Sequence, residues 1–128
     1  MAGKDGFKLD EFFAALADKT RLRLLNLMRD GEVCVCFFAE TLGTNNPKIS
    51  RHLAYLKRSN LVTARREGKW MHYSLNRPKD PLAAELFTSL LKTLESDEEM
   101  QGDRAALVDV CCSPRKELVV ITGQNRKR

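Results

Sequence analysis

Two cysteines separated by one residue, Cys34 and Cys36, have the clearest capacity for chemistry in this chain. Thiolates are soft ligands that suit soft metal and metalloid ions. On a regular helix the two side chains point to nearly opposite sides, because each residue advances about 100°, whereas residues i and i+2 of an extended segment share a face. Joint ligation therefore favours a distorted first turn in the helix predicted to begin near residues 33–35. The alternative is that each cysteine is a small buried hydrophobe.

A second thiol pair, Cys111 and Cys112, follows the last long helical pattern. Adjacent thiols can chelate a soft ion with little rearrangement of the chain. They can also supply a third sulfur to Cys34 and Cys36, within one subunit or across a dimer. The remaining alternative is an incidental exposed pair in a tail that the sequence constrains weakly.

Positive charge is concentrated in residues 44–77. This segment holds eight Lys and Arg residues and one Glu, a net +7, so the rest of a chain with a total of +5 sums to −2. Such a basic segment on a nearly neutral body is the electrostatic footprint of a nucleic-acid surface. The alternative is a solvated surface, which we disfavour because the charge coincides with a helix-turn-helix pattern.

Apolar spacing and capping residues predict four helices, a hairpin and a long final helix. The fourth helix is expected to be capped by Asn46, with Pro47 at its first position, and to run to about Ser59. The strands are expected at 61–66 and 69–75 and the final helix at 82–100. The fold class is therefore α+β, mainly α: a winged helix-turn-helix over residues 1–102, with a C-terminal extension over 103–128 that carries the vicinal cysteines.

The fourth helix and the hairpin are the expected DNA-binding elements. Ser50, Arg51 and His52 lie near the helix start, the part that usually meets base edges, and Arg51 is suited to a bidentate contact with guanine. For the two histidines, His52 and His72, a base, phosphate or packing contact is expected rather than metal ligation. Phosphates are expected to be contacted by Lys48, Lys57, Arg58, Arg66 and Lys69.

The first and last helices carry more apolar surface than one small domain needs, which favours a homodimer, because helix-turn-helix proteins usually read two half-sites. The alternative is that Leu90, Leu91 and Leu94 of the last helix only cover the core of one subunit. The expected dimer interface consists of Leu9, Phe12, Phe13, Leu86, Phe87, Leu90, Leu91 and Leu94.

Four segments together resemble the arsenic-responsive repressors of the ArsR/SmtB family: residues 17–22 (ADKTRL), 32–36 (EVCVC), 47–53 (PKISRHL) and 68–73 (GKWMHY). The resemblance implies a homodimeric winged-helix repressor of double-stranded operator DNA. It also implies release by arsenite or antimonite, bound as trivalent arsenic or antimony to thiolates. The candidate ligands here are Cys34, Cys36, Cys111 and Cys112.

Two departures separate this chain from the arsenical type. That type commonly has a third cysteine three residues after the dithiol, where this chain has Ala39, and often an aspartate directly after it, where this chain has Phe37. The family's three-thiolate site is therefore not carried over whole, and the two tail cysteines are the candidates to complete it.

Several other functions are disfavoured. No apolar run is long enough to span a membrane, and no secretory h-region is seen, so a cytoplasmic protein with reduced thiols is expected. A thiol enzyme such as an arsenate reductase is not expected, because neither cysteine pair lies in a Cys-x5-Arg loop or a Cys-x-x-Cys motif. Zinc is disfavoured, because residues 82–100 hold no histidine. A redox- or reactive-sulfur-sensing repressor using the same cysteines stays open, as does a DNA-binding protein without a ligand.

Overall fold

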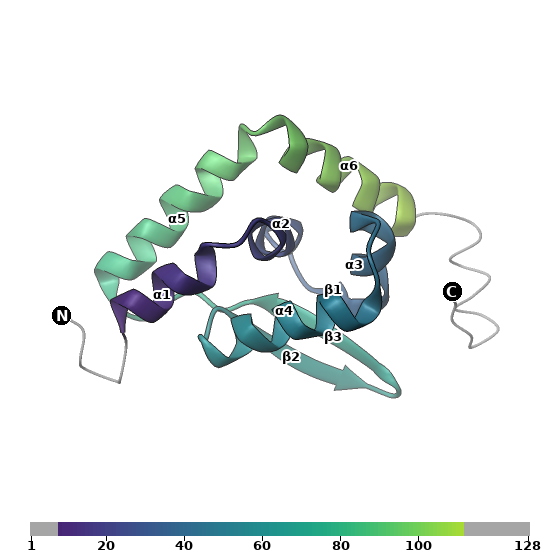
Figure 1. Ribbon diagram of the computed structural model, residues 1–128, viewed down its shortest axis with the longest axis horizontal. Coiled ribbons are helices and arrows are strands. Elements are labelled where there is room, and N and C mark those ends of the chain that lie inside the picture. The colour runs from purple at the N-terminus through teal and green to yellow at the C-terminus, as the bar shows by residue number, and fades with distance from the viewer. Residues whose placement is uncertain (1–7, 112–128) are drawn as a thin grey trace.

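The computed structural model describes residues 8–111, which form six helices and three short strands (Figure 1). In chain order these are α1 (Leu9–Leu16), α2 (Lys19–Leu27), β1 (Val33–Cys34), α3 (Val35–Leu42), α4 (Asn46–Arg58), β2 (Val62–Glu67), β3 (Trp70–Leu75), α5 (Pro81–Glu95) and α6 (Glu98–Cys111). The α3–α4 pair followed by the β2–β3 hairpin confirms the predicted winged helix-turn-helix.

Local side-chain caps mark where α2 and α4 begin. The Asp18 carboxylate accepts the Arg21 N–H at 3.1 Å at the start of α2. Asn45 Oδ1 accepts the Lys48 N–H at 2.9 Å at the start of α4. The cap of α4 therefore lies one residue before the predicted Asn46. Pro47 still stands in the first turn, where its missing N–H costs no helical hydrogen bond.

The three strands form one antiparallel sheet in the order β1-β3-β2. The hairpin turns at Gly68, whose φ of 63° is readily adopted by glycine. Strand β1 was not predicted, because two residues are too few to show an alternating pattern. It exists through pairing with a distant part of the chain, with Val33 opposite Tyr73 and Cys34 opposite His72.

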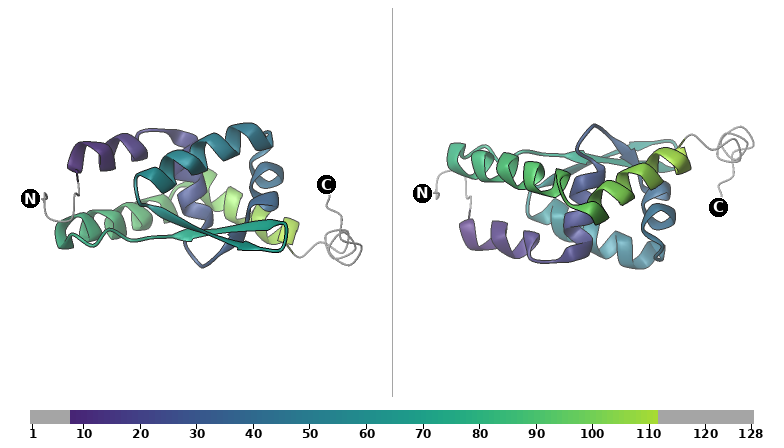
Figure 2. Two further views of the ribbon diagram at one scale, coloured as in Figure 1. Left: turned by 90° about the horizontal axis from the view of Figure 1, so that it is seen from below. Right: turned by 90° about the horizontal axis from the view of Figure 1, so that it is seen from above.

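The predicted single helix over 82–100 is wrong: the chain forms α5 and α6, which meet at a bend at residues 96–97 and arch over α2 (Figures 1 and 2). Asp97 caps α6 by accepting the Met100 N–H at 3.1 Å. Helix α6 runs across the expected domain limit at 102–103, so that limit does not separate structural elements. No helix within residues 8–111 is long and apolar enough to cross a membrane.

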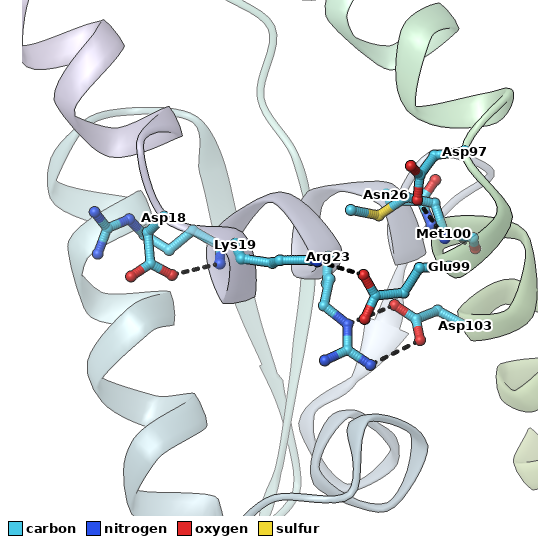
Figure 3. A network of polar contacts seen from close by, with 9 residues as sticks. Asp18, Lys19, Arg23, Asn26, Asp97, Glu99, Met100 and Asp103 are labelled. Atoms are coloured by element: carbon cyan, nitrogen blue, oxygen red, sulfur yellow. Dashed lines mark hydrogen bonds and ion pairs between the residues drawn. The ribbon is translucent and has the colours of Figure 1, made fainter.

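Polar contacts fasten α6 to α2 (Figure 3). The Arg23 guanidinium donates to both Asp103 oxygens, at 2.8 and 2.9 Å, and Asp103 is only 6% exposed. Hydrogen bonding to Asp103 raises the pKa of Arg23. Asn26 Nδ2, fully buried, donates to the Met100 carbonyl at 3.0 Å. These bonds satisfy polar groups that would otherwise be costly to bury.

Residues of α1 and α5 belong to the hydrophobic core, together with residues of the elements between them. Part of the expected dimer interface therefore lies inside the subunit. Four residues of that expected set are buried in the subunit's own core and are not available to a partner: Phe12, Phe87, Leu91 and Leu94. Leu90 is half-buried against the same core. By contrast, the large apolar residues that remain exposed on α1 and α5 are Leu9, Phe13, Leu82 and Leu86.

Candidate functional site

The thiols of Cys34 and Cys36 lie 3.2 Å apart at the junction of β1 and α3. Cys34 is the last residue of β1 and the N-cap of α3, with φ −69° and ψ 139°. Because its backbone is extended, it does not follow the helical spiral, and its sulfur converges with that of Cys36 in the first turn. The two sulfurs thus meet without an unwound first turn in α3, because Cys34 lies in the extended segment before it. The separation exceeds the S–S bond length of about 2.05 Å, so the pair is two thiols.

The distance between the sulfurs constrains which ion they can share. If both bonds to the ion are about 2.3 Å long, as zinc–sulfur bonds are, a tetrahedral ion holds its two sulfurs roughly 3.8 Å apart. The observed 3.2 Å corresponds to an angle of about 90° at the ion for the same bond length. The pair as folded is therefore better matched to an ion that forms bonds at near right angles.

A third ligand is not assembled beside this pair in residues 8–111, where no group of three or more His, Cys, Asp or Glu side chains could hold a metal ion. Ala39, at the position where a third thiol was looked for, is half-buried on α3. Cys111 is the exposed last residue of α6, whose final turn lies beside α3 (Figures 1 and 2). Cys112 lies outside the described residues.

The dithiol is joined to the wing through the sheet. His72 of β3 is the Cα partner of both Cys34 on β1 and Arg65 on β2. Directly paired residues project to the same face of a sheet, so these three side chains form one row across all three strands. A change in the backbone at Cys34 therefore acts first on β3 of the wing.

An ion pair spans the same three strands. Glu32, which precedes β1, accepts two hydrogen bonds from Arg65 at 2.9 and 2.6 Å. Arg65 also reaches Glu67 at 3.3 Å, and His72 Nε2 lies 3.5 Å from the same Glu67 carboxylate. The hydrogen bond from Arg65 lowers the pKa of Glu32. Sequence reasoning placed Arg65 within the basic segment and missed this partner, because the two residues meet only when β1 joins the sheet.

The predicted DNA-binding side chains are presented by α4 and the wing. On α4, Ile49, Leu53 and Leu56 are fully buried. The opposite faces of α4 and the hairpin expose Lys48, Ser50, Arg51, Lys57, Arg58, Arg66 and Lys69. Packing of the apolar stripe thus directs the predicted contact residues to solvent, on the side of the molecule away from α5 and α6 (Figure 1).

His52 differs from the other predicted contact residues, because it turns toward α2 and is 17% exposed. Its Nδ1 lies 3.4 Å from Nη1 of Arg21. The Arg21 guanidinium also donates to the Ala15 carbonyl at 2.8 Å and lies 4.1 Å from the centre of the Tyr55 ring. Arg21 therefore ties the end of α1 to α4. No spacing in the sequence signals this role, since the partners of Arg21 lie on two other helices, α1 and α4.

The pKa of Glu32 offers a test of the ion pair that spans the sheet. We expect the carboxyl to titrate below the usual value of about 4.3 and to return toward it in Arg65→Gln. The stabilisation from this pair is present above the usual pKa and is lost as pH falls through the lowered one. Carbon-detected NMR titration measures both values, with Arg66→Gln as the matched control. A parent Glu32 that titrates at its usual value would contradict the pairing.

Comparisons with known proteins agree with this geometry. The family model described as "Bacterial regulatory protein, arsR family" matches residues 18–64. The arsenical resistance operon repressor of Escherichia coli is 48% identical over 67 residues, 52% of this chain and 57% of that protein. The arsenic resistance regulator ArsR2 of Pseudomonas putida is 36% identical over 96 residues, covering 74% and 81%. A probable mercury resistance operon repressor of Streptomyces lividans is 39% identical over 100 residues, covering 78% and 72%.

Solved structures give the same fold. The transcriptional repressor BigR of Xylella fastidiosa superimposes with a TM-score of 0.60 at 28% identity, over 70% of this chain and 86% of that one. Reduced HlyU of Vibrio cholerae superimposes with a TM-score of 0.59 at 27% identity, over 70% of this chain and 92% of that one. The chain spans about half the length of the E. coli repressor and of a second P. putida regulator, ArsR1. Its match to ArsR2 covers most of that relative, and on this basis the chain belongs to the arsR family of bacterial regulatory proteins.

Proposed function

We propose that this chain is a homodimeric transcriptional repressor that binds double-stranded operator DNA and is released when Cys34 and Cys36 bind trivalent arsenic or antimony. The observation that carries the proposal is the 3.2 Å contact between the two thiols, of which Cys34 lies on β1 and is paired with His72 of the wing strand β3. Trivalent arsenic and antimony form pyramidal sites with near-right angles between bonds, which this separation suits. Relatives named as an arsenical resistance operon repressor and as an arsenic resistance transcriptional regulator support the same inducer class.

DNA recognition is assigned to the exposed face of α4, and the wing is assigned to the phosphate backbone. Arg51 is exposed in the first half of α4, where it can reach a base edge, and Lys69 is exposed at the tip of the hairpin. His52 is reassigned from DNA contact to packing, because it lies against Arg21. The expected division is that Arg51 reads sequence and Lys69 fixes position.

Arg51→Ala is expected to weaken specific operator binding by about 1–3 kcal/mol through loss of a bidentate base contact. Lys69→Ala is expected to weaken binding to all sequences and to reduce the salt slope by about one. Fluorescence anisotropy on operator and scrambled DNA over a salt series distinguishes the two effects, with Lys8→Ala as a control. If both variants bind like the parent, α4 and the wing are not the DNA surface.

The dimer interface is assigned to the exposed apolar residues of α1 and α5. Leu9, Phe13, Leu82 and Leu86 are between 37% and 68% exposed, and the starts of both helices lie at the same end of the molecule (Figures 1 and 2). Covering such side chains with a second copy removes apolar surface from water, which favours association. Two copies also present two α4 helices, as a symmetric operator requires.

Leu86→Glu is expected to dissociate the dimer, because it places an unpaired charge in the interface. The matched control is Val108→Glu, which introduces the same charge at a residue that is 61% exposed on α6. Sedimentation velocity at micromolar concentration measures both. A monomeric parent, or dissociation by Val108→Glu instead, would show that the interface is not on α1 and α5.

We infer that release from DNA begins when a third sulfur ligand approaches the ion held by Cys34 and Cys36. Cys34 and Cys36 are already in contact, so binding one ion to both requires little motion. Completing a three-sulfur site requires another donor to approach, and the candidates are Cys111, on the helix packed against α3, and Cys112. That approach would strain β1, its pairing with β3, and the α3–α4 unit. A 100-fold preference of the inducer for the released state corresponds to about 2.7 kcal/mol of coupling.

Cys34→Ser and Cys36→Ser are expected to repress normally and to lose the response to arsenite, because each removes one of the two converged sulfurs. The double variant Cys111→Ser/Cys112→Ser is expected to weaken the response to arsenite or to abolish one to methylated arsenite. Operator release titrated with each arsenical measures this. If the double variant loses every response while the Cys34 and Cys36 variants keep theirs, the tail pair is the sensor.

The 3.2 Å contact also favours a second candidate, a redox- or reactive-sulfur-sensing repressor of the same fold. Peroxide would take two electrons from the thiols, which lose two protons and form a disulfide as peroxide becomes water. Titrating operator release side by side with arsenite, antimonite, zinc and peroxide separates the candidates. Release by peroxide alone, reversed by dithiothreitol, would replace the metalloid proposal.

A further inference from the structure

We propose that a cleft between the end of α2, α5 and α6 is a binding site for a small phosphorylated anion. The cleft has a volume of about 360 Å³ and opens to solvent. Four cations line it, Arg29, Arg77, Lys92 and Arg104, together with the two carboxylates Asp30 and Glu95. This inference does not rest on the proposed repressor function, because it uses neither the thiols nor the residues assigned to DNA.

Three of the four cations lack a hydrogen-bonded carboxylate partner within residues 8–111. Arg29 donates to neutral acceptors: Asn26 Oδ1 at 3.0–3.1 Å and the Leu91 carbonyl at 2.6 Å. These bonds engage its Nε and Nη2 and leave Nη1 available to a ligand. Arg77 makes only a 3.5 Å contact with the Thr88 hydroxyl and lies over the Phe87 ring.

The charges inside the cleft are therefore not balanced by the protein. Only Arg104 has a direct anionic partner, Asp30. Four positive and two negative side chains leave a net +2, which a dianion would match. Burial, followed by the repulsion of Arg104, lowers the pKa of Arg29, and the Glu95 carboxylate acts in the opposite direction. A bound anion would remove that repulsion.

The side-chain chemistry favours a phosphoryl group. Guanidinium groups present planar forks that bind phosphate oxygens in pairs, and a neighbouring ammonium adds a compact point charge. The volume lies at the small end of the usual range for small-molecule sites, about 300–1,000 Å³. A single phosphoryl group with a short organic part suits this space better than a polymer.

The cleft is separate from the predicted DNA surface. It is built from α5, α6, residues 29–30 after α2 and Arg77 between β3 and α5, whereas α4 and the β2–β3 wing lie on the other side of the molecule (Figure 1). The phosphates of DNA bound to α4 would therefore not fill it. An anion held there would instead bridge α2, α5 and α6.

Isothermal calorimetry of the full chain with inorganic phosphate, glycerol 3-phosphate and sulfate, at physiological ionic strength, tests the proposal. We expect saturable binding of at least one phosphate compound. Arg77→Gln and Lys92→Gln should each weaken it about tenfold or more, the cost of a lost charge-assisted hydrogen bond. The matched controls Arg66→Gln and Lys8→Gln, which remove equal charges outside the cleft, should not weaken it.

The outcomes distinguish the ligand source and the site. If only inorganic phosphate saturates the cleft, the ligand is a free oxyanion. If only glycerol 3-phosphate saturates it, the ligand is a phosphorylated small molecule. Absence of saturation by either, or equal weakening in cleft and control variants, overturns the proposal. Operator affinity of Arg77→Gln and Lys92→Gln should be unchanged. If these two variants lose operator affinity while the parent protein still binds phosphate and they do not, the proposed DNA surface is wrong and the cleft proposal stands.

Discussion

The pairing of Val33 and Cys34 with β3 is the constraint on which the candidate thiol site depends. It keeps the backbone of Cys34 extended up to the residue where α3 begins, so the next sulfur along the helix turns back toward it. Without this strand, Cys34 and Cys36 would follow a helical spiral and diverge. The same pairing joins the dithiol to the wing through His72. Chemistry at the sulfurs and position of the wing are therefore linked by backbone hydrogen bonds, not by a flexible loop.

The orientation of α4 has a different origin. Its apolar stripe is buried completely, which leaves the basic residues only outward directions. Arg21 then adds a polar anchor, because its guanidinium satisfies a carbonyl at the end of α1 while stacking on Tyr55 and approaching His52. Apolar burial supplies most of the stabilisation in such packing, and the hydrogen bonds select one arrangement of the helices. A recognition surface needs both, since contacts to bases tolerate little misplacement.

Helix α6 is held against α2 by polar contacts, and its position determines which residues lie near its two ends. The Arg23–Asp103 pair and the bond from Asn26 to the Met100 carbonyl hold it on α2. This placement directs the last turn of α6 toward α3, and it brings Arg104 beside the cleft that contains Arg29. One helix thus carries both Cys111 at its end, near α3, and Arg104, which lines the cleft with Arg29.

The sequence by itself indicated the first four helices, the hairpin and the basic character of α4 and the wing, while the assignment of Cys34 and Cys36 to a soft ion stays a prediction. These depend on local spacing, capping and composition, which each segment carries within itself. It placed the cap of α4 within one residue, and it misread α5 and α6 as one helix because no glycine or proline marks the break at residues 96–97. The resemblance to the arsenic-responsive family came from short motifs in the same segments.

Tertiary structure alone decided which apolar residues are core and which are exposed, as the separation of Phe87 from Leu86 illustrates. It also decided the contact between the thiols, the partner of Arg65 and the grouping of cations around the cleft. Each of these depends on pairing between residues distant in the chain, such as Cys34 with His72 or Glu32 with Arg65. Periodicity within one segment contains no information about such partners, because they meet only when separate elements pack together.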